Sequence, residues 1–406
     1  MKNRVVITGM GIWSCLGTTL DEVRDALYEG KCGVIFDPKR IEAGFLSGLC
    51  TNVPKPNLKP FLDKKVRNFM PEEAEYAYMA TRAALEHAKL EQDYIDAHEV
   101  GLIYGNDSVA EATVQAIDKF RNFKASTACG SGAIFQSMNS TVTMNLACIF
   151  HLKGINLTAS AACASGSQAI GLGALLIRDG LQECVICGGA QENNPTCVAS
   201  FDGINAFSKR NDDPKHASRP FDRDRDGLIP GGGAATVILE SYEHAVKRGA
   251  PILAEVVGWG FSGNGAHIST PNVEGPARSL ELSLLNGEVN PRDIGYVNAH
   301  ATSTRAGDGR EAEAIARIFG DYKVPVTSTK GQTGHEMWMA GASEMVYSML
   351  MMKNDFIAGN INFENADEHT NCVNVIPETR KTHFDMFLSN SFGFGGTNSS
   401  LIVKNL

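Results

Sequence analysis

Positive charge is scarce in this sequence. Its 406 residues include 37 Lys and Arg against 46 Asp and Glu, so the formal net charge is −9. Nucleic acids and anionic membranes are bound through broad basic surfaces that attract phosphate. We therefore predict that the chain binds neither nucleic acid nor membrane. The excess of acidic residues argues less strongly against an acidic protein partner, because the net charge does not show how charges are distributed over the surface.

Long hydrophobic runs are also missing. No apolar stretch approaches the roughly 18 residues that a membrane-spanning helix needs. Met1–Trp13 is basic and then apolar, but Thr8, Gly9 and Gly11 interrupt it and no small-residue cleavage pattern follows. This pattern is typical of a buried first strand and not of a signal peptide. We expect a cytoplasmic protein.

Two phosphate-binding signatures are incomplete. The glycine-rich segment Leu388–Asn398 lacks the GxxxxGK[ST] pattern, and the pairs Gly9–Gly11 and Gly231–Gly233 do not extend to GxGxxG. Both signatures place backbone N–H groups around phosphates. Their absence disfavours a dinucleotide site, and we expect no cofactor.

The ten cysteines do not require a disulfide scaffold, because a chain of this length builds a core without cross-links. Cys184 and Cys187 have the spacing of a redox or zinc motif. They lie, however, in an apolar, strand-like run with no second pair. We interpret both as buried core residues.

Short β-branched runs alternate with longer helical patterns along most of the chain, which is 43% apolar. This alternation predicts an α/β fold with strands buried on both faces. The polar segment Asn205–Asp226 predicts a long surface loop or a connection between halves. A division near residue 250 gives two parts, residues 1–250 and 251–406. The expected strands are Arg4–Thr8, Val100–Tyr104, Cys184–Cys187, Ala235–Leu239, Ile252–Gly258, Tyr296–Ala299, Val324–Ser328 and Ser400–Val403, and the expected helices are Glu72–Lys89, Ser165–Arg178, Arg278–Asn286, Gly309–Phe319 and Ala340–Lys353.

Small residues surround Cys163 in Ala159–Gly173 (ASAACASGSQAIGLG), and a helical pattern starts directly after it. Unpaired N–H groups at a helix N-terminus favour the thiolate form of a cysteine. The small neighbours suit a sharp strand-to-helix turn that exposes a nucleophile to a substrate carbonyl. The residues alone leave two interpretations open, a nucleophile and a buried structural cysteine.

Two histidines follow predicted strands. His300 lies among Ser, Thr and Gly residues, and His335 has Lys330 five residues before it. Strand C-termini in α/β sheets bring side chains of separate loops together. A cysteine with two such histidines could accept an acyl group from a thioester, while imidazole N–H groups stabilise an oxyanion or enolate. Each histidine alone is more often structural, and a metal site of His300, Asp308 and His335 has no ligand-spacing signature.

Glycines surround Phe392 and Phe394 near the C-terminus. Such glycines let the backbone approach a ligand while the two rings pack nearby. The pattern is equally typical of a tight turn before the last strand.

Four segments occur in one order and spacing: ASAACASGSQAIG, VNAHATSTRAGD, TSTKGQTGH and SNSFGFGGTN. Together they resemble the β-ketoacyl-[acyl carrier protein] synthases, above all the elongating types I and II. The resemblance extends from RVVITGMGIWSCLG through SRPFDRDRDGLIPGGGAATVILE to the last strand. It implies a thiolase-like fold, in which two similar βαβαβαββ halves form a five-layer αβαβα sandwich, usually as a homodimer.

The resemblance also implies a reaction. Cys163 receives an acyl chain from the phosphopantetheine of acyl carrier protein, and His300 and His335 promote decarboxylation of malonyl-carrier. The resulting carbanion equivalent attacks the Cys163 thioester in a Claisen condensation and gives a β-ketoacyl chain two carbons longer. The resemblance further implies that the N–H groups of Cys163 and Phe394 form the oxyanion hole, and that Phe394 acts as a gate. Lys330 is expected to orient His335, with Glu344 in the surrounding network. Thr302 and Thr304 are expected to bind phosphopantetheine, and Phe392 to contact the substrate.

A basic segment matches the docking region of the family. Lys64, Lys65 and Arg67 lie within Leu62–Met70. Acyl carrier proteins are strongly acidic, and a local positive patch on a negative surface would orient such a partner. The residues alone are also typical of a solvated loop.

The chain departs from the family pattern near the predicted site. Glu336–Gly341 replaces the usual small residues after His335, Ala301 replaces a glycine, and Gly105–Val109 differs from the common glycine-rich form. We hypothesise a specialised acyl chain, unsaturated or aryl-primed as in polyene pathways. Two other functions are alternatives: a non-catalytic partner like the chain-length factors, which lack the cysteine, and an acyl-thioester hydrolase, which releases no CO2.

Overall fold

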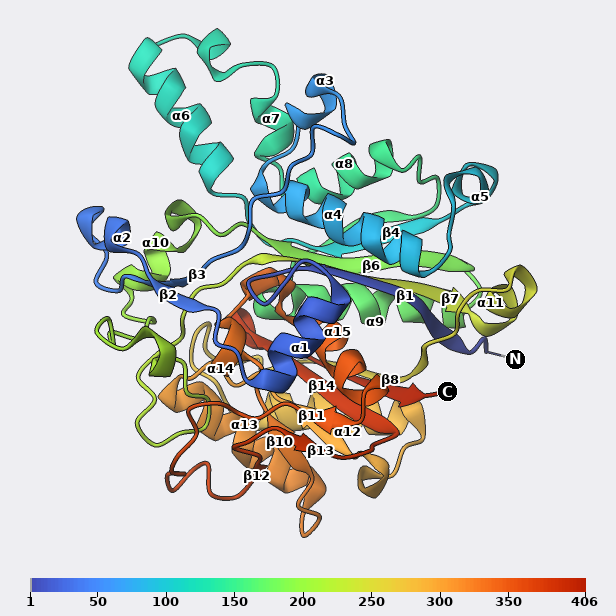
Figure 1. The fold of residues 1–406 in the computed structure, drawn as a ribbon, viewed down its shortest axis with the longest axis vertical. Coiled ribbons are helices and arrows are strands. Elements are labelled where there is room, and N and C mark those ends of the chain that lie inside the picture. The colour runs from blue at the N-terminus through green and yellow to red at the C-terminus, as the bar shows by residue number, and fades with distance from the viewer. Residues whose placement is uncertain (1) are drawn as a thin grey trace.

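Eleven strands form one continuous sheet in the computed structural model, which describes residues 2–406. Their order across the sheet is β12-β10-β9-β14-β15-β8-β1-β7-β6-β4-β5 (Figure 1). Two small two-stranded sheets, β2-β3 and β11-β13, lie outside it. The strands are β1 (Val5–Trp13), β2 (Val34–Phe36), β3 (Leu49–Thr51), β4 (Gly101–Gly105), β5 (Asn156–Ala159), β6 (Cys184–Gln191), β7 (Gly233–Ser241), β8 (Ala254–Gly263), β9 (Tyr296–Asn298), β10 (Pro325–Thr327), β11 (Phe356–Ile357), β12 (Asn374–Val375), β13 (Arg380–Lys381), β14 (Met386–Gly393) and β15 (Thr397–Asn405).

The two halves of the sheet repeat one pattern of pairing. Strands β5, β4 and β6 are parallel, and β7 and β1 continue the sheet in antiparallel pairs. Strands β10, β9 and β14 are likewise parallel, and β15 and β8 follow in antiparallel pairs. The halves meet where Val6 and Ile7 of β1 pair with Glu255 and Ala254 of β8. With their helices, the strands of both halves follow the predicted βαβαβαββ order.

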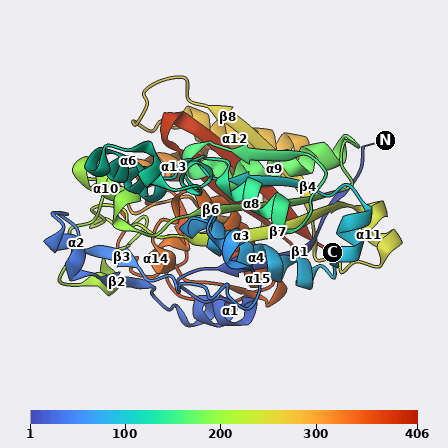
Figure 2. The same ribbon diagram turned by 90° about the horizontal axis from the view of Figure 1, so that it is seen from above.

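The two halves of this sheet form two layers, and helices form the other three. Helix α4 packs on β1 and β7 at one side, α12 packs on β8 and β15 at the other, and α9 and α15 lie between the two halves (Figure 1). Helix α1 packs on α15 (Figure 2). The predicted αβαβα sandwich is confirmed. The helices are α1 (Leu20–Glu29), α2 (Pro38–Glu42), α3 (Lys64–Arg67), α4 (Glu72–His87), α5 (Gln92–Ala97), α6 (Glu111–Phe123), α7 (Ala133–Gln136), α8 (Thr141–Ile149), α9 (Ser165–Arg178), α10 (Pro195–Gly203), α11 (Tyr242–Arg248), α12 (Glu274–Gly287), α13 (Arg305–Phe319), α14 (Lys330–Thr333) and α15 (Ala340–Lys353).

The two central helices touch backbone to backbone at their N-terminal ends. A Cβ atom on Gly166 of α9 would lie 2.9 Å from the backbone nitrogen of Ala342, and one on Gly341 of α15 would lie 2.6 Å from that of Ser167. Only glycine permits such an approach from both sides. The contact brings the turns that precede α9 and α15 next to each other.

The polar segment at residues 205–226 is both loop and connection. Residues 209–216 are largely exposed, whereas 217–222 are mostly buried. The buried Arg225 guanidinium pairs with Asp308 of α13 at 3.7 Å and with Asp367 at 2.7 Å. Paired charges therefore allow this polar sequence to link the two halves of the chain.

Cys184 and Cys187 lie on opposite faces of β6. Cys184 packs in the apolar cluster under α4, and Cys187 packs in the cluster that includes α9. Both are buried free thiols. They cannot form one redox or metal pair, and their interpretation as core residues is confirmed. Within residues 2–406, no helix combines the length and apolar character needed to cross a bilayer.

Candidate active site

Cys163 lies in a 3-10 turn, η2 (Ala162–Ala164), between β5 and α9. Ala162 has a left-handed φ of 47°. The Ser165 hydroxyl closes the turn, because it accepts from the Ala161 N–H at 2.9 Å and donates to the Ala162 carbonyl at 2.6 Å. The predicted strand-to-helix turn is therefore present, and it holds the sulfur at the beginning of α9.

The structure brings Cys163, His300 and His335 together. Nε2 of His335 lies 3.0 Å from the Cys163 Sγ atom, and the two imidazole rings are 5.2 Å apart at an interplanar angle of 85°. One side-chain nitrogen of each histidine and the sulfur all lie within 4.8 Å of one another. All three residues are buried, and all three line one cavity.

Glu311 of α13 fixes the backbone that carries His300. Its carboxylate accepts from the N–H groups of His300 at 2.8 Å and Ala301 at 2.7 Å. The Asn390 amide donates to the same carboxylate at 3.1 Å. Burial raises the pKa of Glu311 to about 7. Glu311 is not among the residues predicted from the sequence, although its position in the helix directly after the His300 loop was a usable signal.

Lys330 and Glu344 form a buried pair behind the histidines. The Lys330 ammonium donates to the Glu344 carboxylate, and neither side chain lines the cavity. Burial raises the pKa of Glu344 to about 7. Burial, and then the Lys330 charge, hold the pKa values of His300 and His335 well below the usual range. Both imidazoles are therefore neutral at pH 7, and Glu344 belongs to the supporting network and not to the cavity wall.

The Cys163 thiol is protonated at rest. Burial raises its pKa to about 12, and the nearby Lys330 charge opposes this only in part. The helix N-terminus that favours thiolate in the sequence argument is thus outweighed by desolvation. Because His335 Nε2 lies 3.0 Å from the sulfur, it is the nearest group that can take the thiol proton when the sulfur attacks.

Asp308 does not join the histidines. Its carboxylate accepts from the N–H groups of Phe221 at 2.8 Å and Thr304 at 3.2 Å, and it lies 3.7 Å from the Arg225 guanidinium. These contacts anchor the loops around the site. The metal set of His300, Asp308 and His335 is therefore not assembled.

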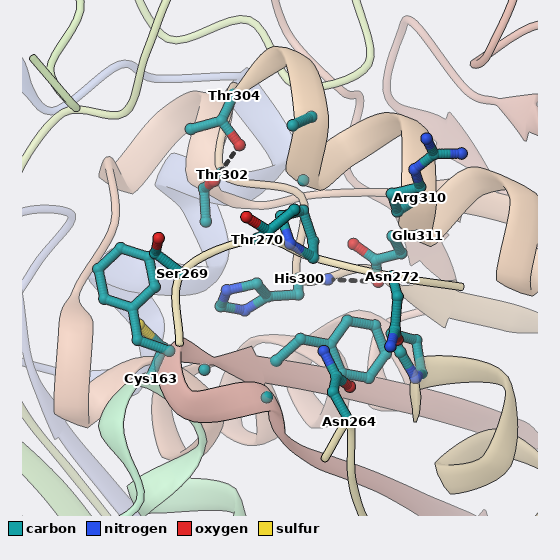
Figure 3. A pocket seen from close by; sticks show the side chains of 18 of the residues that line it. Cys163, Asn264, Ser269, Thr270, Asn272, His300, Thr302, Thr304, Arg310 and Glu311 are labelled. Carbon is teal, nitrogen blue, oxygen red and sulfur yellow. Dashed lines mark hydrogen bonds between the residues drawn. The ribbon is translucent and has the colours of Figure 1, made fainter. Parts of the chain in front are cut away.

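The cavity has a volume of about 300 Å³ and opens beside the predicted substrate contacts. Thr302 and Thr304 line it, with their hydroxyl oxygens 3.1 Å apart (Figure 3). The loop Asn264–Asn272 forms the facing wall. One wall offers hydroxyl groups, and the other offers side-chain amides and further hydroxyls. Such groups can hydrogen-bond the amide groups of a phosphopantetheine arm. The sequence analysis did not identify the second wall.

Phe392 and Phe394 lie at the end of β14, next to the cysteine turn. A Cβ atom on Gly393 would lie 3.1 Å from the Cys163 backbone nitrogen. The Phe392 ring is 6.1 Å from the His300 ring, and Phe394 is 42% exposed and stacks on Phe201 at 5.8 Å. The glycine-rich segment thus combines features of both interpretations. Phe392, Gly393 and Phe394 line the cavity, and a tight turn with left-handed glycines at Gly395 and Gly396 precedes the last strand.

The basic residues at α3 lie outside this cavity. Lys64 and Lys65 are exposed, whereas the Arg67 guanidinium donates to the Leu62 carbonyl at 3.1 Å. None of the three is among the described residues that line the cavity. Their docking role stays a prediction.

A five-layer fold with a cysteine and two neutral histidines in one cavity defines a thioester-dependent acyltransferase of the thiolase type. The sequence matches two family descriptions, "Beta-ketoacyl synthase, N-terminal domain" over residues 2–245 and "Beta-ketoacyl synthase, C-terminal domain" over residues 253–364. The chain belongs to the β-ketoacyl synthase family.

Individual relatives cover the whole chain. The 3-oxoacyl-[acyl-carrier-protein] synthase 1 of Haemophilus influenzae is 39% identical over 404 residues, which are 99% of this chain and 98% of that protein. The crystal structure of a β-ketoacyl synthase from Burkholderia phymatum superposes with a TM-score of 0.95 at 37% identity and covers 100% of both chains. A type II PKS ketosynthase, solved with its acyl-carrier protein and bound to the hexaketide, reaches a TM-score of 0.88 at 25% identity, again over 100% of both chains.

Proposed function

We propose that the chain catalyses a decarboxylative Claisen condensation between malonyl-[acyl carrier protein] and an acyl chain held on Cys163. The carrying observation is the placement of the Cys163 sulfur 3.0 Å from His335 Nε2, with His300 in the same cavity. A sulfur that holds the acyl donor and two imidazoles that bind the second thioester are the groups this reaction needs.

In the first half-reaction, the Cys163 sulfur attacks the carbonyl carbon of an acyl-carrier thioester. Its proton passes to His335 and from there to the departing phosphopantetheine sulfur, so that one thioester replaces another. The intermediate oxyanion lies between the N–H groups of Cys163 and Phe394, which the close approach of Gly393 to the cysteine turn brings near each other. The small residues Ala161, Ala162 and Ala164 leave the sulfur accessible to the substrate.

In the second half-reaction, His300 and His335 donate Nε2–H hydrogen bonds to the thioester oxygen of malonyl-carrier. His335 does so after proton exchange with solvent moves its single proton from Nδ1 to Nε2. The carbon–carbon bond to the carboxylate breaks, CO2 leaves, and the enolate carbon attacks the Cys163 thioester. The carbon–sulfur bond breaks, the departing thiolate takes one proton from solvent, and a β-ketoacyl carrier two carbons longer is released. Neutral imidazoles suit this step, because they donate to a developing oxyanion without a charged ground state.

The two alternative functions fit the site less well. A chain-length factor needs no nucleophile, yet this chain keeps Cys163 in contact with His335. A thioester hydrolase needs a base that activates water. The nearest candidate base, His335 Nε2, is already in contact with the Cys163 sulfur at 3.0 Å.

We propose acyl carrier protein as the partner, in agreement with the carrier-bound ketosynthase among the relatives. Lys64, Lys65 and Arg67 are the proposed docking patch, and Thr302 and Thr304 the phosphopantetheine contacts. The proposal needs no cofactor besides the carrier's phosphopantetheine, and it places the enzyme in the cytoplasm. The nucleophile belongs to the unit 1–250 and the histidines to the unit 251–406.

A homodimer is part of the same proposal. β5 is an edge strand of the sheet, and its Leu157 is 47% exposed. Helix α6 projects from the body of the molecule next to α7 (Figure 1). Large apolar side chains are exposed on this α6–α7 arm, namely Val114, Ile117, Phe120, Phe123, Ile134 and Phe135. A second copy that covers the strand edge and the arm would bury these groups.

The test is a reconstituted assay with malonyl-carrier labelled in its free carboxylate and a panel of saturated, unsaturated and aryl-primed acyl carriers. We expect labelled CO2 and a carrier product two carbons longer, with the specialised chains preferred over plain saturated ones. Hydrolysis of acyl-carrier without CO2 release would contradict the proposed function. A clean preference for plain saturated medium-chain carriers would contradict the substrate hypothesis alone.

A further inference from the structure

The turn before α15 has the same construction as the cysteine turn before α9. Each is a three-residue 3-10 turn that leads directly into a 14-residue helix: η2 (Ala162–Ala164) and η5 (Met337–Met339). The first residue of each, Ala162 and Met337, has a φ of 47°. Trp338 therefore occupies in its turn the position that Cys163 occupies in the other.

Several contacts hold the Trp338 turn rigid. The buried Glu336 carboxylate accepts from the Ser343 hydroxyl at 2.5 Å and from the Tyr347 hydroxyl at 2.9 Å. The Trp338 carbonyl oxygen lies against Gly189, where an added Cβ would approach it to 2.7 Å. A turn fixed at both ends presents its side chain in one position.

The Trp338 side chain packs in the same apolar cluster as the nucleophile. The cluster consists of Cys163, Val198, Phe207, Leu228, Met337 and Trp338. Trp338 is only 8% exposed and does not line the cavity described above, so a chain on the sulfur meets its indole where it extends from the cavity into this cluster. A large ring at this point limits how far an acyl chain can extend from Cys163.

The indole also brings a polar group into this cluster. Its Nε1–H is buried and has no hydrogen-bond partner among residues 2–406. Buried donors without a partner are rare, because each one loses its hydrogen bond to water without replacement. An oxygen atom on the bound acyl chain would supply that partner.

We propose that Trp338 is a specificity residue for the acyl group on Cys163: its ring limits chain length, and its N–H pairs with an oxygen atom carried by the chain. The inference rests on the proposed function, because it concerns the acyl donor of that reaction. The substrate class is an acyl chain of limited length with a keto or hydroxyl oxygen.

The experiment measures the rate of Cys163 acylation by intact mass. The donors are carrier-bound octanoyl, 3-oxo-, 5-oxo- and 7-oxo-octanoyl groups, together with dodecanoyl. We expect the wild type to load one of the oxo chains about five- to tenfold faster than octanoyl, in proportion to one hydrogen bond, and to load dodecanoyl poorly.

Two variants separate the ring from its N–H group. Trp338→Phe keeps a large ring and should make the favoured oxo chain and octanoyl load equally, while dodecanoyl stays poor. Trp338→Ala should improve dodecanoyl loading about tenfold relative to octanoyl. Thermal unfolding of both variants checks that they are folded, and the Phe variant alone still tests the N–H group if the Ala variant does not fold.

The outcomes distinguish this proposal from the function on which it rests. An unchanged oxo-to-octanoyl ratio in Trp338→Phe would overturn the role of the N–H group, as would equal loading of every oxo chain and octanoyl by the wild type. Equal dodecanoyl discrimination in wild type and Trp338→Ala would overturn the length limit. If wild type accepts no acyl group and releases no CO2, the proposed function itself fails.

Discussion

The two turns that meet at the centre of the molecule use one backbone design for opposite purposes. The cysteine turn is built from small residues, Ala161, Ala162 and Ala164, around the sulfur. The other turn follows His335 with bulky residues, of which Met337 and Trp338 pack against Cys163. Cys163 lines the cavity and Met337 and Trp338 do not, so the bulky turn fills the side of the sulfur that faces away from the cavity.

The two turns also differ in the ionisable groups that surround them. At the first turn, desolvation keeps the Cys163 thiol protonated until a substrate arrives. Around the second turn lie a buried ion pair, Lys330 with Glu344, and a further buried carboxyl, Glu336. Cys163, His300 and His335 are therefore neutral, and the Lys330–Glu344 ion pair lies outside the cavity that these three residues line.

The largest effect is expected from removing the sulfur of the first turn. Cys163→Ala should lower condensation by at least about a thousandfold, because no acyl-enzyme can form. Malonyl-carrier decarboxylation should continue, because the histidines of the other half remain. Intact mass and CO2 release are measured on one protein sample. Full condensation by the variant would refute Cys163 as the nucleophile.

The next prediction concerns the two histidines, which lie in the second half of the chain. His300→Ala or His335→Ala should reduce decarboxylation about a hundredfold or more, since each removes one donor to the enolate oxygen. Cys163 should still be acylated to a measurable extent, and more readily in His300→Ala, which keeps the 3.0 Å contact of His335 with the sulfur. Undiminished CO2 release by both variants would argue against the assigned roles.

The buried Glu336 gives the second turn a pH-dependent stability. Burial raises its pKa from 4.5 to about 7, so the folded chain binds a proton that the unfolded chain releases. The stability that this proton provides is complete below pH 4.5 and is lost as the pH rises through 7. Glu336→Gln keeps a neutral acceptor, so between pH 4.5 and 7 wild type should lose about 3 kcal/mol of unfolding free energy relative to the variant.

Urea unfolding at pH 5 and pH 7.5 measures this difference. Glu368→Gln is the matched control, because the Glu368 side chain is 88% exposed. Parallel stability changes with pH in wild type and Glu336→Gln would show that Glu336 stays ionised in the fold.

The smallest effect concerns a region outside both turns. Charge reversal at Lys64 and Lys65 should raise the apparent KM for carrier-bound substrates about tenfold, because it weakens docking of an acidic carrier. Small thioester mimics should react at the wild-type rate in both half-reactions. A matching loss with the mimics would place the defect in the site and not in docking.

The parts of the molecule that follow local rules were predictable from the sequence. Helices Ser165–Arg178 and Ala340–Lys353 begin and end where expected, because each follows a turn and has a clear apolar pattern. The expected strand Arg4–Thr8 extends to Trp13 in the structure, because Gly9 and Gly11 pack against the backbone of α4 where a side chain would not fit. Cys163, His300 and His335 were found by their motifs.

The parts that depend on distant contacts were not predictable. Glu311 acts on a loop ten residues before it, and the wall Asn264–Asn272 contains no motif of its own. The effect of burial on the Cys163 thiol exceeds that of the helix end, and burial is a property of the whole fold. The two turns match in their backbone angles. Their sequences, ACA at 162–164 and MWM at 337–339, share no residue and so give no sign of the match.

The central claim is that the two halves divide the reaction, with acyl transfer at Cys163 and decarboxylation at the histidines. The most direct measurement mixes Cys163→Ala and His300→Ala separately with acyl-carrier and labelled malonyl-carrier, and records acyl-enzyme mass and CO2 in each sample. We predict CO2 without acyl-enzyme from Cys163→Ala, and acyl-enzyme with little CO2 from His300→Ala. Acyl-enzyme on Cys163→Ala, or loss of both signals in both variants, would contradict the account.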